Sequence, residues 1–279
     1  MTFAIHTYSF PTTIHFGAGA RQRLPDTIAQ LGIQQPLVVS DRDIAQLPWF
    51  KEILGLLDAP VQPFTEVWGN PVVSQVAAGL VAFREQNADG IIAVGGGAPM
   101  DVAKAIALMA YHPGHLFDYE DGRPETRLVD RPVPSIVAIP TTAGTGSEVG
   151  RSTVISDDDT HAKKIMFAPQ LLPQAVLADP ELLLGLPAKI TAATGMDALT
   201  HLIEAFLAKG YQPLCDGIAL EGLRLVAEHL VDCVTFARRL AAGDTLSEAE
   251  KAAHLEARGG MLNAAMMGAI AFQKGLGLF

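Results

Sequence analysis

An acidic and an imidazole side chain stand four residues apart in the segment TGMDALTHLIEAF (194–206). The segment has the apolar periodicity of a helix, so Asp197 and His201 are expected to project from one helical face. A carboxylate and an imidazole placed in this way form half of a site for Fe²⁺ or Zn²⁺. The same spacing occurs far more often on a solvated helix face or in a hydrogen bond within the helix, so both interpretations stay open.

Three consecutive glycines in AVGGGAPMD (93–101) lie between an apolar strand pattern and a helical pattern. Backbone without side chains at Gly96 and Gly97 lets a pyrophosphate approach closely, and the N–H groups and dipole of the following helix attract the anion. Asp101 lies near the start of that helix. The segment is not a G-x-G-x-x-G, so a tight turn that needs glycine for its geometry alone is an equal alternative.

One strand earlier, PLVVSD (36–41) ends in an aspartate. The carboxylate of Asp41 could accept hydrogen bonds from an adenosine ribose, and its charge would repel the 2′-phosphate of NADP, which favours NAD. Capping of the following turn explains the same residue equally well.

Hydroxyl groups crowd the segment PTTAGTGSE (140–148), which follows a third apolar strand pattern. Thr141, Thr142, Thr145 and Ser147 surround two glycines and are suited to bind a polar ligand at the carboxyl edge of a sheet. A turn stabilised by its own hydrogen bonds gives the same pattern.

These segments need a sheet to position them, and the first part of the chain has the pattern of one. Short, almost fully apolar runs alternate with helical patterns, which predicts a doubly wound, mostly parallel α/β sheet. From about residue 187 the chain becomes rich in alanine and leucine with helical periodicity. We therefore expect an α/β domain over 1–187 and an all-α domain over 188–279, with an exposed loop at 121–132. The expected strands are 36–40, 90–96 and 134–140, and the expected helices of the first domain are 74–86 and 100–112.

Composition excludes several classes of protein. The 279 residues contain 20 Lys and Arg against 30 Asp and Glu, a net charge of −10, which argues against a nucleic-acid partner. No apolar stretch is long enough to cross a membrane, and the N-terminus lacks the pattern of a secretory signal. Two cysteines cannot form a disulfide framework, so a cytoplasmic location is expected.

Taken together, the segments resemble the iron-containing (group III) alcohol dehydrogenase family. The resemblance runs along the whole chain, and Ala98 stands where such enzymes usually have serine. Its motifs occur in the family's order: FGAGA (16–20), GGGAPMD (95–101), PTTAGTGSE (140–148), ADPEL (178–182), ATGMDALTHLIEAF (193–206) and GLGL (275–278).

The resemblance implies a dehydroquinate synthase-like architecture and an NAD-dependent enzyme that oxidises a small alcohol or reduces an aldehyde with the help of Fe²⁺ or Zn²⁺. It implies that Asp197 and His201 bind the metal and assigns no catalytic residue beyond the metal site. The cofactor-binding residues that it implies are Asp41 at the adenosine ribose, Gly96, Gly97 and Asp101 at the pyrophosphate, Thr141, Thr142 and Thr145 along the cofactor, and Lys164 at a ribose.

In this family a histidine, the third metal ligand, follows GLGL closely, and the sequence stops at Phe279. The resemblance therefore implies two protein ligands of four in this chain and a truncated helical domain. A cofactor-binding but inactive member of the family is the alternative, and a lyase or maleylacetate reductase of the same fold is a third possibility. We also expect the apolar run 261–272 to be exposed and to favour association, with a homodimer as the expected assembly.

Overall fold

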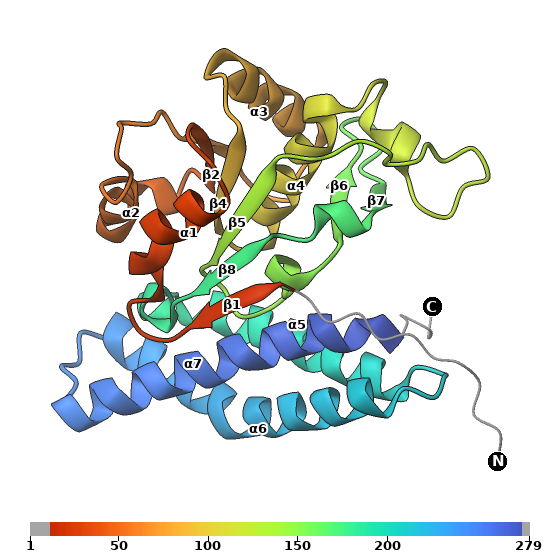
Figure 1. Cartoon of the computed structure of the whole chain (residues 1–279). Coiled ribbons are helices and arrows are strands. Elements are labelled where there is room, and N and C mark those ends of the chain that lie inside the picture. The colour runs from red at the N-terminus through yellow and green to blue at the C-terminus, as the bar shows by residue number, and fades with distance from the viewer. Residues whose placement is uncertain (1–11, 275–279) are drawn as a thin grey trace. The chain divides into compact units, whose positions relative to one another are not determined.

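The computed structural model describes residues 12–274, which form two compact units. The α/β unit consists of Thr12–Thr141 and Gly150–Leu182. The helical unit contains, within the described residues, 183–274 together with the short segment 142–149. Each unit is therefore assembled from more than one segment of the chain. The division into continuous domains at 1–187 and 188–279 stays a prediction. Figure 1 shows the elements of each unit.

A single sheet of six strands forms the centre of the α/β unit, in the order β1-β8-β5-β4-β2-β3. Every neighbouring pair is parallel, which confirms the predicted parallel sheet. The two central strands pair in register from Gly90 with Ser135 to Gly95 with Pro140. The strands are β1 (Thr13–Phe16), β2 (Pro36–Asp41), β3 (Phe64–Val67), β4 (Gly90–Gly95), β5 (Ser135–Pro140) and β8 (Ala175–Ala178).

Helices cover both faces of this sheet. The chain crosses the sheet in one direction from β1 through β2 to β3, and in the other direction from β3 through β4 to β5. Because parallel crossovers are right-handed, the first two helices cover one face and the next two cover the other, as Figure 1 shows. They are α1 (Leu24–Gln30), α2 (Pro48–Leu54), α3 (Val73–Glu85) and α4 (Gly97–Tyr111).

The core of the unit lies between β4 and the helix that follows it. Residues 91–94 of β4 have no exposed surface, and residues 102–108 of α4 are almost completely buried as well. An antiparallel hairpin, β6 (Ser152–Ser156) and β7 (Lys163–Phe167), packs beside α4. The segment 121–132 is largely exposed and without regular secondary structure, as predicted.

The helical unit contains three long helices that pack against one another, which confirms the predicted all-α region. They are α5 (Ala188–Leu207), α6 (Pro213–Ala241) and α7 (Glu248–Ala271). The last begins with a capping box in which the Ser247 hydroxyl accepts from the Glu250 amide and the Glu250 carboxylate accepts from the Ser247 amide.

The expected exposure of the run 261–272 is wrong. Met261, Leu262 and Met266 are each at most 3% exposed, because α7 packs against both α5 and α6. The association that we expected from this run therefore loses its structural basis. Of the described helices, none is long and apolar enough to cross a membrane.

Candidate cofactor and metal site

Glycine backbone forms the turn between β4 and α4. Gly95 adopts φ +155°, and a Cβ atom there would lie 2.6 Å from Cγ of Pro99. Gly96 is the residue before the helix, Gly97 is its first residue, and both are half-buried. The helix therefore begins three residues before the predicted start at residue 100, and glycine backbone forms its N-terminal turn. Such a turn offers N–H groups and the positive end of the helix dipole to an anion.

Side chains of α4 fix this helix to the neighbouring hairpin. The Asp101 carboxylate accepts a hydrogen bond from the Val154 amide (3.2 Å), and the Asp101 carbonyl accepts one from the Thr153 hydroxyl (2.7 Å). One turn further on, the ammonium group of Lys104 is buried and donates to the carbonyls of Gly150 and Ser152, both at 2.9 Å. The assignment of Asp101 to the pyrophosphate region stays a prediction. In the structure the carboxylate of Asp101 is hydrogen-bonded to the Val154 amide.

Asp41 caps the turn after β2. Its Oδ1 accepts hydrogen bonds from the amides of Asp43 (3.0 Å) and Ile44 (2.7 Å). Burial raises the pKa of this carboxyl, and the two amide hydrogen bonds partly offset that rise. The capping interpretation of Asp41 is thus confirmed by these contacts, and its contact with a ribose stays a prediction.

The threonine loop divides between the two units. Thr141 is buried in the α/β unit, where its amide donates to the carbonyl of Gly95 at 3.0 Å. Thr142 and Thr145 belong to the helical unit, and the hydroxyl of Thr145 accepts from the Ser147 amide (3.2 Å). Within that unit Gly146, at φ +63°, packs so tightly on α7 that a Cβ would lie 2.5 Å from Cβ of Ala269. The contact of Thr141, Thr142 and Thr145 with a cofactor stays a prediction.

Lys164 lies on β7 and is held by a carboxylate and an aromatic ring. Its ammonium group is 3.5 Å from Oε2 of Glu120 and 4.2 Å from the ring centre of Phe117. Glu120 also forms an ion pair with Arg123 at 2.7 Å. The predicted contact of Lys164 with a ribose is untested, and these neighbours would compete for its charge.

Asp197 and His201 share one face of α5, as their spacing predicts. Nε2 of His201 lies 3.4 Å from Oδ1 of Asp197, and the imidazole packs edge-on against the ring of Phe272, with ring centres 4.7 Å apart. Nδ1 of His201 is buried and has no hydrogen-bond partner among the described residues. Within residues 12–274 no group of three or more His, Cys, Asp or Glu side chains could hold a metal ion. The motif GLGL (275–278) lies outside the described residues.

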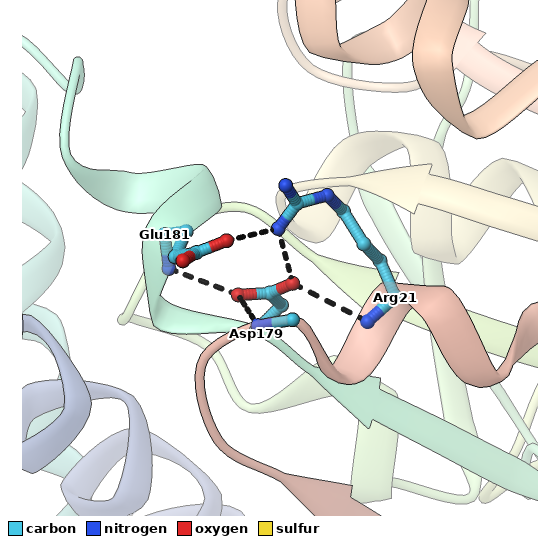
Figure 2. Close-up of polar contacts among 4 residues, drawn as sticks. Arg21, Asp179 and Glu181 are labelled. Atoms are coloured by element: carbon cyan, nitrogen blue, oxygen red, sulfur yellow. Dashed lines mark hydrogen bonds and ion pairs between the residues drawn. The ribbon is translucent and has the colours of Figure 1, made fainter.

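A buried carboxylate at the end of β8 was not assigned a role from the sequence. Asp179 has no exposed surface and accepts from the amides of Gly19 (3.2 Å), Arg21 (3.3 Å) and Glu181 (3.1 Å). The Arg21 guanidinium donates to Asp179 at 2.6 Å and also binds Glu181, as Figure 2 shows. Asp179 therefore joins the turn after β1 to the turn after β8. The motifs FGAGA and ADPEL were visible in the sequence, but nothing in either one indicated that they touch.

The sequence matches two family descriptions. "Iron-containing alcohol dehydrogenase" matches residues 11–180, and "Fe-containing alcohol dehydrogenase family, C-terminal" matches residues 191–278. The first alone covers more than half of the chain. This chain belongs to the iron-containing alcohol dehydrogenase family.

Similar proteins support this membership. A 4-hydroxybutyrate dehydrogenase of Cupriavidus necator is 40% identical over 271 residues, which are 95% of this chain and 66% of that protein. A crystal structure of a 1,3-propanediol oxidoreductase superposes with a TM-score of 0.85 at 34% identity, covering 96% of this chain and 66% of the other. A sulfoacetaldehyde reductase from Bifidobacterium kashiwanohense, crystallised with NAD⁺, gives a TM-score of 0.80 at 30% identity, covering 97% and 67%. This chain thus spans 66–67% of the length of these three relatives.

Proposed function

We propose that this protein binds NAD and, with a divalent metal, oxidises a small alcohol or reduces the corresponding aldehyde. The observation that carries the proposal is the turn at Gly95–Gly97, where a buried parallel strand runs through bare backbone into a buried helix. That arrangement suits a pyrophosphate at the carboxyl edge of a parallel sheet. The relatives are named for small hydroxy or carbonyl compounds, which supports the substrate class.

The α/β unit would hold the nucleotide through groups along one edge of its sheet. The turn at Gly96 and Gly97 would take the pyrophosphate, with Asp101 beside it. Asp41 ends β2, which pairs directly with β4, so its carboxylate would meet the adenosine ribose at the same edge. We assign Thr141, Thr142, Thr145 and Lys164 to further contacts with the cofactor.

The donor set of Asp197 and His201 fits a divalent metal. The two side chains already face one another on α5, and the imidazole has a buried nitrogen without a partner among the described residues. We assign Asp197 and His201 as ligands of Fe²⁺ or Zn²⁺. Such a metal would supply a Lewis acid for an alcohol oxygen in a hydride-transfer reaction, and Asp197 and His201 would hold it.

A cofactor-binding protein without alcohol turnover is the second candidate function. It is favoured by the finding that residues 12–274 contain no group of three or more His, Cys, Asp or Glu side chains suited to a metal. Two protein ligands hold a divalent ion weakly, because structural and catalytic sites normally supply three or four.

One set of measurements separates the two candidates. We expect the purified chain to bind NADH, to retain Fe²⁺ or Zn²⁺, and to oxidise 1,3-propanediol or 4-hydroxybutyrate with NAD. His201→Ala should lower metal retention and turnover by about 100-fold or more and leave the Kd for NADH unchanged. His161→Asn, in the turn of the β6–β7 hairpin, is the matched control and should change neither.

The outcomes have distinct meanings. NADH binding without turnover at saturating metal would support the second candidate over the first. Absence of NADH binding would refute both. A chelator should abolish turnover, and added metal should restore it; turnover that resists complete metal removal would contradict the assignment of Asp197 and His201.

Location and assembly complete the proposal. Cys215 and Cys233 are both free and buried, which fits a reducing compartment such as the cytoplasm. We keep a homodimer as the proposed assembly, and light scattering of the purified chain at several concentrations tests it.

A further inference from the structure

The C-terminal end of α7 packs on His201 at two points. Gly268 approaches so closely that a Cβ at this glycine would lie 3.3 Å from Cβ of His201. Four residues further on, the ring of Phe272 contacts the imidazole edge-on, with ring centres 4.7 Å apart and an interplanar angle of 70°. Phe272 is the C-cap residue of α7 and keeps helical dihedral angles. Because residues four apart lie on one face of a helix, a single face of α7 covers His201 from its Cβ to its ring.

Packing supplies to His201 the restraint that a hydrogen bond usually gives to a metal-binding histidine. Such a histidine normally donates the N–H of its second ring nitrogen to a carboxylate or a carbonyl, which fixes the ring. Nε2 of His201 faces Asp197 at 3.4 Å, and Nδ1 is buried with no hydrogen-bond partner among the described residues. Within this part of the chain, the contact that limits rotation of the imidazole is therefore the ring of Phe272.

Phe272 begins a short 3₁₀ turn, η7 (Phe272–Lys274), which is anchored at its other end. The ammonium group of Lys274 is 5% exposed and forms an ion pair with the Asp216 carboxylate at 2.6 Å. It also donates to the carbonyl of Phe206 at 2.8 Å. Asp216 lies in the first turn of α6, and Phe206 lies in the last turn of α5. Lys274 therefore joins the segment that carries Phe272 to both of the other long helices.

We propose that Phe272 is a positioning residue for the metal ligand His201, and that Lys274 keeps Phe272 in place. Phe272 supplies no ligand atom; it restricts the imidazole to the orientation in which Nε2 faces Asp197. A side chain already held in its binding orientation loses less conformational entropy when it binds an ion. This inference rests on the proposed assignment of Asp197 and His201 as ligands and adds the residues that arrange them.

The test measures Zn²⁺ binding to the metal-free chain by isothermal titration calorimetry at neutral pH. His201→Ala defines the binding to other sites, so only the part that this variant loses is compared. We expect Phe272→Leu to raise the Kd of that part about fivefold, because leucine fills space without the edge-on contact that holds the imidazole. Phe272→Tyr keeps the ring and should bring the Kd to within about twofold of the unaltered chain.

Phe236→Leu is the matched control, because it removes a phenyl ring from another histidine of the helical unit. The ring of Phe236 lies 5.1 Å from that of His254. The control should lower stability toward urea as Phe272→Leu does and leave the Kd for Zn²⁺ unchanged. Lys274→Met removes the anchor and should weaken Zn²⁺ by a smaller factor than Phe272→Leu. The two substitutions together should weaken it no more than Phe272→Leu alone, because both act on one imidazole.

The outcomes separate this inference from the proposed metal site. An unchanged Kd in Phe272→Leu, or an equal weakening by Phe236→Leu, would refute the positioning role and leave His201 as a ligand. Full additivity of Phe272→Leu and Lys274→Met would show that the anchor does not act through Phe272, which would overturn the role of Lys274. If the unaltered chain and His201→Ala bind Zn²⁺ alike, the proposed metal site fails, and the inference fails with it.

Discussion

Removing the carboxylate of Asp179 is expected to destabilise the α/β unit strongly. Asp179→Ala leaves the amides of Gly19, Arg21 and Glu181 and the guanidinium of Arg21 without their shared acceptor. Because Asp179 has no exposed surface, water cannot replace it without opening the two turns shown in Figure 2. The damage would fall on the connection between β1 and β8, which are neighbours at one edge of the sheet.

The magnitude follows from burial and from the number of donors left unpaired. Breaking a buried ion pair by removing one partner costs about 3 to 5 kcal/mol. We therefore expect Asp179→Ala to lower the free energy of unfolding by about 4 kcal/mol. Arg21→Met should cost only about 1 to 2 kcal/mol, because Asp179 keeps three amide donors.

The assay is urea unfolding followed by tryptophan fluorescence. Both tryptophans of the chain, Trp49 and Trp68, lie in the α/β unit, so the signal reports the unit that contains the contact. Asp179→Asn, which keeps the shape and one acceptor oxygen, should fall between the other two variants. Lys51→Gln changes an exposed side chain of α2 in the same unit and is the control, with no expected change in the unfolding midpoint.

The order of the variants is the critical result. If Arg21→Met destabilises the protein as much as Asp179→Ala, the amide hydrogen bonds of Asp179 contribute little and the reasoning from burial fails. A cost below about 1 kcal/mol for Asp179→Ala would show that the two turns hold together without the carboxylate.

Two further predictions concern the glycine turn and a buried histidine. Gly95→Ala should weaken NADH binding and lower stability, because the new Cβ would lie 2.6 Å from Pro99. Gly55→Ala is the control and should leave NADH binding unchanged, because the nearest atoms to its new Cβ are 3.4 Å away. Equal NADH affinities of the two variants would contradict the packing argument. Burial and the charge of Arg258 lower the pKa of His254 from 6.5 to about 4, so its contribution to stability is complete above pH 6.5 and is lost as the pH falls toward 4. Urea unfolding followed by circular dichroism should show about 2 kcal/mol less stability from this residue at about pH 5 than at neutral pH, and His254→Gln should remove that part of the pH dependence; an unchanged pH dependence in the variant would refute it.

The elements that the sequence predicted well are those whose own residues determine them. The apolar runs at 36–40, 90–96 and 134–140 correspond within one residue to β2, β4 and β5, because strands buried on both faces are almost entirely apolar. The helix predicted at 74–86 is α3, displaced by one residue. The alternation of apolar strand patterns with helical patterns predicted a parallel sheet, and the structure contains that sheet.

The elements that were missed depend on contacts distant in the chain. β1 and β8 are four residues each, too short to give a clear period, and they become strands by pairing with each other and with β5. The turn of the β6–β7 hairpin contains His161 in the left-handed conformation, at φ +57°. Glycine usually marks such a position in a sequence, and here histidine occupies it. The run 261–272 was expected to be exposed because the helical domain was taken to be incomplete, but it packs on two other helices, and only that packing shows that it is buried.

In the candidate site, too, the sequence predicted contacts within one helix and missed contacts between residues distant in the chain. Spacing on one helix predicted correctly that Asp197 and His201 face each other, because both residues belong to α5. The anchoring of Lys104 was invisible, since its acceptors are carbonyls 46 and 48 residues away. The contact between Arg21 and Asp179 spans 158 residues, and each side chain alone has the pattern of an ordinary surface charge.

The alternatives that the sequence left open at the nucleotide edge do not exclude one another. Asp41 caps a turn through Oδ1, and Asp101 accepts the Val154 amide through Oδ2. A carboxylate has about four acceptor positions, so an amide hydrogen bond fixes its orientation and leaves capacity for a ligand. A side chain already held by its own backbone also loses less conformational entropy when a ligand binds. Capping is therefore a reason for Asp41 to recognise a ribose well, and Asp41→Ala should disturb the turn and the affinity for 5′-AMP together.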